Sequence, residues 1–154
     1  MNKINVTLTE AVDTDKCFFI DVHHMAYRGV IEEMFGWNAA LQRDYATAAF
    51  DSGNIHLIWF NTEKIGVIGL DVKHDHVWLK QLFILPDYQR KGVGSFAVNW
   101  AIEIANSVGK DLRLQTLKAN TGAKQFYQGL GFSLEEETEL HWVLSLPSDA
   151  NRSA

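Results

Sequence analysis

The sequence has very little cysteine, no excess of basic charge and no long apolar run. Cys17 is the only cysteine among 154 residues, so the chain cannot form an intrachain disulfide. The net charge is -5, whereas a nucleic-acid-binding protein needs a basic surface. No stretch approaches the roughly 18 apolar residues of a membrane helix, and residues 1–10 lack the apolar core of a signal peptide. We therefore expect a cytoplasmic protein that binds neither nucleic acid nor membrane.

The remaining composition is that of an ordinary globular chain. With 47% apolar and 21% charged residues, a chain of this length can bury a proper core as one domain. Cys17 lies in the apolar stretch 17–20, which favours a small buried side chain over a reactive thiol. The acidic balance is compatible with a cationic substrate, although solubility alone explains it.

The apolar pattern predicts one α/β domain. Alternating and β-rich runs predict strands over 4–8, 54–60, 65–74, 76–86 and 111–117, and a final hairpin within 132–147. Helical spacing predicts helices over 13–30, 38–50, 92–108 and 121–130. The first predicted strands form an antiparallel meander, and a βαβ crossover follows them along the chain. We therefore expect a mixed, mostly antiparallel central sheet flanked by helices. The domain is expected to span 1–147, with a disordered tail over 148–154.

A glycine-containing loop, QRKGVGS at residues 89–95, separates a predicted strand from a predicted helix. The start of a helix has unpaired N–H groups and the positive end of the helix dipole, which together favour an anion. Gly92 and Gly94 allow the backbone to approach a ligand closely. Arg90 and Lys91 add positive charge. The loop therefore predicts a diphosphate site.

Two other phosphate-binding motifs fit this loop less well. A Walker A loop needs a lysine after its glycines, whereas Lys91 precedes them, so we reject it. Gly92, Gly94 and Ala97 match the G-x-G-x-x-A fingerprint of dinucleotide-binding oxidoreductases. However, six residues separate the strand from Gly92, and no acidic residue ends the next predicted strand. An oxidoreductase remains the minor alternative.

Two segments resemble the motifs of one enzyme family. LFILPDYQRKGVGS, at 82–95, resembles the acetyl-CoA loop of the GNAT superfamily of N-acyltransferases. ANTGAKQFYQGLGF, at 119–132, resembles that family's Asn-x-x-Ala-x-x-Phe-Tyr-x-x-x-Gly-Phe signature. The element order over 2–146 is similar as well. The resemblance implies a GNAT-like fold and an N-acetyltransferase that moves an acetyl group from acetyl-CoA to an amine within a ternary complex.

The resemblance also implies where acetyl-CoA binds. The pyrophosphate would lie on the backbone N–H groups of residues 90–95. The pantetheine arm would pair with a strand that splays from its neighbour, with the N–H of Ile84 as the expected oxyanion donor. Asn120 could cap the helix that follows and hydrogen-bond the cofactor or a catalytic water. The implied cofactor-binding residues are Leu82, Phe83, Ile84, Arg90, Lys91, Gly92, Val93, Gly94, Ser95 and Asn120.

Tyr127 is the catalytic residue that the resemblance implies, as the general acid that protonates the CoA thiolate. The alternative is that Phe126 and Tyr127 only pack their helix. Some family members carry a glutamate, which acts as the general base, where this chain has Gln115. Others carry it about where this chain has Trp78 or Lys80. None of these three residues is acidic. The remaining candidates for the base are Glu32, Glu33, Asp71 and His76. This departure keeps a second class open, an acyl-CoA-binding sensor or interaction module.

The segment YRGVIEEMFGWN, at 27–38, would wall the acceptor pocket in a GNAT-like fold. Tyr27, Glu33 and Trp37 would suit an amine with an apolar or extended body, whereas an ordinary helix end with solvent-facing acids is the alternative. We expect a small-molecule amine, although the sequence does not identify it. The resemblance is also compatible with a homodimer through the last strands.

No metal site is expected. The segment that contains His74 and His76 is more typical of a polar hairpin tip than of a pair of metal ligands. His23 and His24 are adjacent on a predicted helix, where they would point to different faces.

Overall fold

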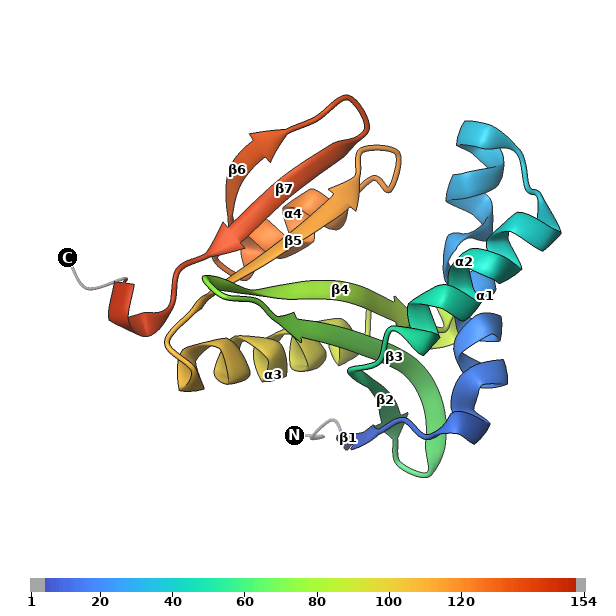
Figure 1. Cartoon of the computed structure of the whole chain (residues 1–154), viewed down its shortest axis with the longest axis horizontal. Coiled ribbons are helices and arrows are strands. Elements are labelled where there is room, and N and C mark those ends of the chain that lie inside the picture. The colour runs from blue at the N-terminus through green and yellow to red at the C-terminus, as the bar shows by residue number, and fades with distance from the viewer. Residues whose placement is uncertain (1–4, 152–154) are drawn as a thin grey trace. The chain divides into compact units, whose positions relative to one another are not determined.

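The computed structural model describes residues 5–151 (Figure 1). The strands are β1 (Val6–Glu10), β2 (Ile55–Phe60), β3 (Glu63–Val72), β4 (His76–Ile84), β5 (Asp111–Leu117), β6 (Ser133–Glu137) and β7 (His141–Leu146). The α-helices are α1 (Lys16–Phe35), α2 (Ala39–Asp51), α3 (Val93–Ser107) and α4 (Ala123–Gly129). Three short 3-10 turns are η1 (Asp13–Asp15), η2 (Pro86–Tyr88) and η3 (Asp149–Asn151).

The seven strands form one sheet in the order β1-β2-β3-β4-β5-β7-β6. The pairs β1–β2, β2–β3, β5–β7 and β6–β7 are antiparallel, and β4 runs parallel to β5. The predicted α/β class, with a mixed and mostly antiparallel sheet, is confirmed. The described chain divides into two compact units, 5–69 with 81–97 and 70–80 with 98–151. Strands β3 and β4 each contribute to both units.

The first unit has an aromatic and aliphatic core between α1, α2 and the strands. Phe19 of α1 is fully buried, and its ring contacts those of Phe50 and Phe83 edge-on, at centroid distances of 5.6 and 6.1 Å. Val22, Leu57 and other apolar side chains complete this core. Burial of each large side chain contributes about 1.5–3 kcal/mol, so this core holds α1 beside the β4 residue Phe83.

Local signals set the ends of the first two helices. Helix α1 ends at Gly36, where φ of 75° takes the chain out of the helix. Helix α2 begins after Asn38, whose side-chain oxygen accepts a hydrogen bond from the N–H of Leu41 at 3.0 Å. The joint between the two helices is therefore only three residues long.

The prediction of a buried Cys17 is wrong, because the residue is exposed. The helix buries Phe19, Ile20 and Val22, so its buried stripe starts two residues after Cys17. Cys17 instead shares the solvent face of α1 with Asp21, four positions later.

The second unit is built on the pairing of β5 with β7. Leu112, Leu114 and Leu144 are almost fully buried within it. Side-chain oxygens hold its last described residues in place. The N–H of Ser148 donates to Asp111 Oδ1 at 2.9 Å, and the N–H of Asp149 donates to Asn106 Oδ1 at 3.0 Å. Residues 152–154 lie outside the described part of the chain.

Candidate functional site

The predicted diphosphate loop lies in the first unit and joins β4 to α3 through η2. Its backbone passes twice through the left-handed region, at Arg90 with φ of 61° and at Gly92 with φ of 84°. Helix α3 starts at Val93, and the N–H of Phe96 donates to the Gly92 carbonyl at 3.1 Å. The N–H groups of residues 93–95 therefore precede the first helical hydrogen bond of α3. This is the backbone geometry of an anion site at a helix N-terminus.

Side chains on both sides fix this loop. The side-chain Nε2 of Gln89 donates to the carbonyl of Ile84 at 2.9 Å, which ties the loop back to the end of β4. Val93 is 1% exposed and anchors the start of α3 in the core, whereas Arg90 and Lys91 are exposed. The role of Gln89 was not predicted, although the glycine pattern that identified the loop begins at this residue.

Strand β3 approaches the cofactor-strand segment of β4 very closely at Gly66. A Cβ atom added there would lie 2.5 Å from the carbonyl oxygen of Phe83 and 3.3 Å from the Cα of Ile84. The N–H of Leu85 also donates to the Ile65 carbonyl at 2.8 Å. Only glycine permits this approach, and a glycine inside a predicted strand was the signal that could have found it.

The ladder between β4 and β5 is short. It comprises three residue pairs and ends at Trp78 with Arg113, although β4 continues to Ile84. The predicted pantetheine-binding residues Leu82, Phe83 and Ile84 therefore lie beyond its last pair. Phe83 is 5% exposed and Ile84 9% exposed, so a ligand beside this segment would contact mainly its backbone.

The structure brings Tyr27, one of the predicted acceptor-pocket residues, to the cofactor strand. The rings of Tyr27 and His23 on α1 contact that of Phe83 edge-on, at 5.0 and 5.4 Å between centroids. Trp37 joins the same cluster through His24, whose ring lies 5.1 Å away, and Arg28 covers its ring at 5.3 Å. We call His23, His24, Tyr27, Trp37 and Phe83 the aromatic cluster. The third predicted pocket residue, Glu33, is exposed and takes part in none of these described contacts.

The expectation that His23 and His24 point to different faces is wrong, because their Nδ1 atoms lie 3.0 Å apart. Burial, with a smaller contribution from the His24 charge, lowers the pKa of His23 to about 4. Burial also lowers the pKa of His24 and raises the pKa of Tyr27. Near pH 7 both imidazoles are therefore neutral, with one Nδ1–H donating to the other Nδ1, and the aromatic cluster carries no charge of its own.

The second motif lies in the second unit and forms the short helix α4. Tyr127 packs between Phe126 and Phe132, at ring distances of 5.0 and 5.6 Å. The N–H of Phe132 donates to the Tyr127 carbonyl and that of Gly131 to Gln128, the two hydrogen bonds of a Schellman motif. Gly131, with φ of 102°, thus ends the helix as predicted and fixes the turn of the helix that carries Tyr127.

Asn120 does not cap this helix, contrary to the prediction. The residue before the helix is Gly122, with φ of 92°, and it makes no side-chain cap. Asn120 lies two residues earlier, where its N–H donates to the Leu117 carbonyl and its carbonyl accepts from Ala123. The turn after β5 is longer than expected, because a left-handed glycine is inserted between Asn120 and the helix.

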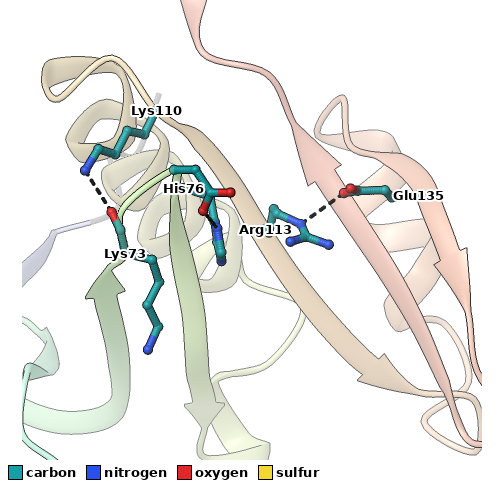
Figure 2. A network of polar contacts seen from close by, with 6 residues as sticks. Lys73, His76, Lys110, Arg113 and Glu135 are labelled. Atoms are coloured by element: carbon teal, nitrogen blue, oxygen red, sulfur yellow. Dashed lines mark hydrogen bonds and ion pairs between the residues drawn. The ribbon is translucent and has the colours of Figure 1, made fainter.

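Three of the four candidate bases, Asp71, His76 and Glu32, lie beside other charged groups. Asp71 lies 3.0 Å from the Nζ of Lys80, whose side chain is 9% exposed. His76 Nδ1 lies 2.7 Å from Asp75, in the network that Figure 2 shows together with the Arg113–Glu135 ion pair. The remaining candidates are Glu32, which lies 3.8 Å from Arg28, and the exposed Glu33.

Residues 5–151 contain no group of three or more His, Cys, Asp or Glu side chains that could hold a metal ion. Within the same range, no helix has the length and apolarity needed to cross a membrane.

The fold and these two motifs define an acyltransferase class, and comparison with known proteins agrees. A profile of the Acetyltransferase (GNAT) family matches residues 18–132, most of the chain. The chain therefore belongs to the GNAT acetyltransferase family. An uncharacterized N-acetyltransferase of Methanocaldococcus jannaschii is 25% identical over 147 residues, which are 89% of this chain and 64% of the relative. The chain thus spans less than two thirds of that relative's length.

Two solved structures share the fold. The PaiA N-acetyltransferase of Thermoplasma acidophilum, in complex with coenzyme A, has a TM-score of 0.75 at 16% identity, covering 94% of this chain and 99% of the other. The ribosomal-protein-S18-alanine N-acetyltransferase of Escherichia coli has a TM-score of 0.72 at 21% identity, covering 97% and 98%. At these identities the likeness concerns the fold.

Proposed function

We propose that the protein is an acetyl-CoA-dependent N-acetyltransferase that transfers the acetyl group directly to an amine in a ternary complex. The observation that carries this proposal is the loop between β4 and α3. It combines two left-handed residues, Arg90 and Gly92, with a helix start at Val93. This geometry supports a diphosphate held by main-chain N–H groups, and family membership supports coenzyme A as its source. We treat residues 1–147 as one N-acetyltransferase domain, because β3 and β4 each contribute to both units.

The proposed roles follow the two motifs. The backbone N–H groups of residues 90–95, with the cations of Arg90 and Lys91, would hold the pyrophosphate. Leu82, Phe83 and Ile84 would hold the pantetheine arm, with the N–H of Ile84 donating to the thioester oxyanion. Asn120 would hydrogen-bond the cofactor from the turn before α4.

The chemical step that we propose is direct attack. The neutral amine attacks the thioester carbon, a tetrahedral oxyanion forms, and the C–S bond breaks. The O–H of Tyr127 protonates the departing thiolate, the proton of the former amine leaves to solvent, and solvent returns a proton to the Tyr127 phenolate. Asp71 and Glu32 are paired with cations, His76 lies beside Asp75, and Glu33 is exposed, and we assign none of these side chains as the base.

For the acceptor we propose a small-molecule amine with an apolar body, held beside Tyr27 and Trp37. The neutral aromatic cluster against Phe83 supports an apolar contact surface there. Glu33, exposed on α1, would meet the cationic end of such a molecule. The Escherichia coli neighbour acts on a ribosomal-protein alanine, so a protein N-terminus is the alternative that a substrate panel must include.

Calorimetry and a thiol-release assay test the proposal. The protein should bind coenzyme A in preference to NAD, and release thiol from acetyl-CoA only when an amine is present. The panel should contain small apolar amines, polyamines and a peptide with a free N-terminus. Binding of coenzyme A without turnover on any amine would favour the acyl-CoA sensor instead. The ion pairs of Asp71 and Glu32 are compatible with that alternative, because they leave neither carboxylate free to act as a base. Preference for NAD would reject the proposed function.

A matched pair of glycine variants tests the loop itself. Gly92 and Gly53 both have φ of 84°, so an alanine at either position costs about 1–2 kcal/mol of backbone strain. Gly53 lies in the turn before β2, with nothing within 4 Å of an added Cβ. Gly92→Ala should weaken coenzyme A binding about tenfold or more, whereas Gly53→Ala should keep it. Equal affinities would remove the loop from cofactor binding.

A further inference from the structure

Strand β4 carries a buried hydrogen-bond acceptor that has no partner. The side-chain Oε1 of Gln81 is inaccessible to solvent and accepts no hydrogen bond from any residue between 5 and 151. A carboxamide oxygen that leaves water without a replacement partner destabilises the folded state, and folded proteins have few such groups. This oxygen therefore requires an explanation beyond packing.

The residues near Gln81 on β4 have no buried side-chain oxygen or nitrogen without a partner. Lys80, one residue earlier, forms an ion pair with Asp71 at 3.0 Å. Phe83, two residues later, packs its ring against the rings of α1. The unpartnered oxygen is thus specific to Gln81 on this part of β4.

The position of Gln81 along the strand points to a ligand. The β4–β5 ladder ends at Trp78, three residues before Gln81. Gln81 directly precedes Leu82–Ile84, the segment that would lie beside the pantetheine arm. A bound molecule on this segment can supply the donor that the chain itself does not, provided that the Gln81 side chain turns its buried oxygen towards that molecule.

We propose that Gln81 Oε1 accepts a hydrogen bond from an N–H group of the bound substrates. This inference rests on the proposed function, because that reaction brings N–H donors to β4 from two sources. One source is the pair of amides in the pantetheine arm of acetyl-CoA, and the other is the acceptor amine. Gln81 is therefore a substrate-binding residue on β4, in addition to the main-chain contacts already proposed.

Gln81→Met is the informative substitution, because Met has a similar length but offers no amide oxygen. In the ligand-free protein it removes an unsatisfied polar group, so Tm should stay the same or rise. Affinity for coenzyme A, measured by calorimetry, should fall about tenfold if a pantetheine amide is the donor. If the acceptor amine is the donor, coenzyme A affinity should stay and KM for the acceptor should rise by a similar factor. Gln81→Leu gives a second apolar side chain should Met disturb the strand.

Ser148→Ala is the matched control. Its Oγ is the other buried side-chain oxygen without a partner in the described chain. It lies just after the end of β7 and beside the start of β5, where the Ser148 N–H donates to Asp111 Oδ1. This variant should also keep or raise Tm, but it should leave coenzyme A affinity and acceptor KM unchanged.

The outcomes separate this inference from the proposed function. If the wild-type protein binds no coenzyme A, the proposed function fails and the Gln81 role fails with it. If the wild-type protein binds and turns over, but both Gln81 variants match it in affinity and KM, only the Gln81 role fails. A variant that loses Tm and affinity together, or an equal loss of affinity in Ser148→Ala, indicates a structural effect and also overturns the role.

Discussion

Gly66→Ala is the sharpest test of how the first unit positions the cofactor strand. The added Cβ would lie 2.5 Å from the Phe83 carbonyl oxygen and 3.3 Å from the Ile84 Cα. Real Cβ contacts lie at 3.0 Å or more, and ordinary contacts at 3.4 Å or more. Both atoms belong to the β4 backbone, so the strain cannot be relieved by rotating a side chain. Segment 83–84 must move away from β3.

The size of the effect follows from this displacement. Overpacking of this kind costs about 1–3 kcal/mol, which lowers Tm by roughly 2–12 °C in a domain of this size. The moved segment includes the Ile84 N–H, the proposed oxyanion donor. A misplacement approaching 1 Å can reduce the rate about 100-fold, so kcat/KM should fall by about 10–100-fold.

The assay is thermal melting combined with thiol release, and Gly29→Ala is the control. Gly29 lies within α1, its φ is not positive, and nothing lies within 4 Å of an added Cβ. Alanine there should stabilise the helix by about 0.5–1 kcal/mol and leave turnover unchanged. If Gly66→Ala melts like the wild type and keeps its kcat/KM, the close approach of β3 does not position the segment and the reasoning is refuted.

Two further predictions concern Tyr127 and His23. Tyr127→Phe should reduce kcat about tenfold or more with coenzyme A affinity nearly unchanged, and unchanged turnover would exclude Tyr127 as the acid. His23 has a folded-state pKa of about 4 against 6.5 when unfolded, so the unfolded chain binds more protons between these values. Stability should be full above pH 6.5 and fall towards pH 4, and urea titrations of His23→Gln should show a flatter fall than those of the wild type.

The parts of the site that were predictable are those encoded by neighbouring residues. The loop at 89–95 combines glycines, cations and a helix start within seven positions, so its conformation could be read locally. Gly131, which ends α4, is another local signal. The two capping hydrogen bonds join Gly131 to Gln128 and Phe132 to Tyr127, so each connects residues at most five positions apart.

The parts that were missed depend on how distant segments meet. Gly66 and Phe83 are seventeen positions apart, and only the register of β3 with β4 brings them together. His23 and His24 converge because their side-chain rotamers turn the rings toward each other, which residue spacing on a helix does not reveal. Asn120 does not cap α4, because the left-handed Gly122 lies between Asn120 and the first residue of the helix. The sequence alone does not show which residue of the turn Asn120-Thr121-Gly122 directly precedes the helix.

Three departures from local structural rules involve β4, the β3 residue that packs against it and the loop after it, and they support a functional role independently of any relative. Arg90 adopts a positive φ, which only two other non-glycine residues of the described chain do, and both are asparagines, for which it is common. Gly66 leaves no room for a Cβ against β4, and Gln81 buries an unpartnered oxygen on it. Each departure costs stability and none is needed to build an α/β sheet. Such costs concentrate where a protein binds or transforms a ligand, so this strand and loop are the segment to which substitutions should be directed first.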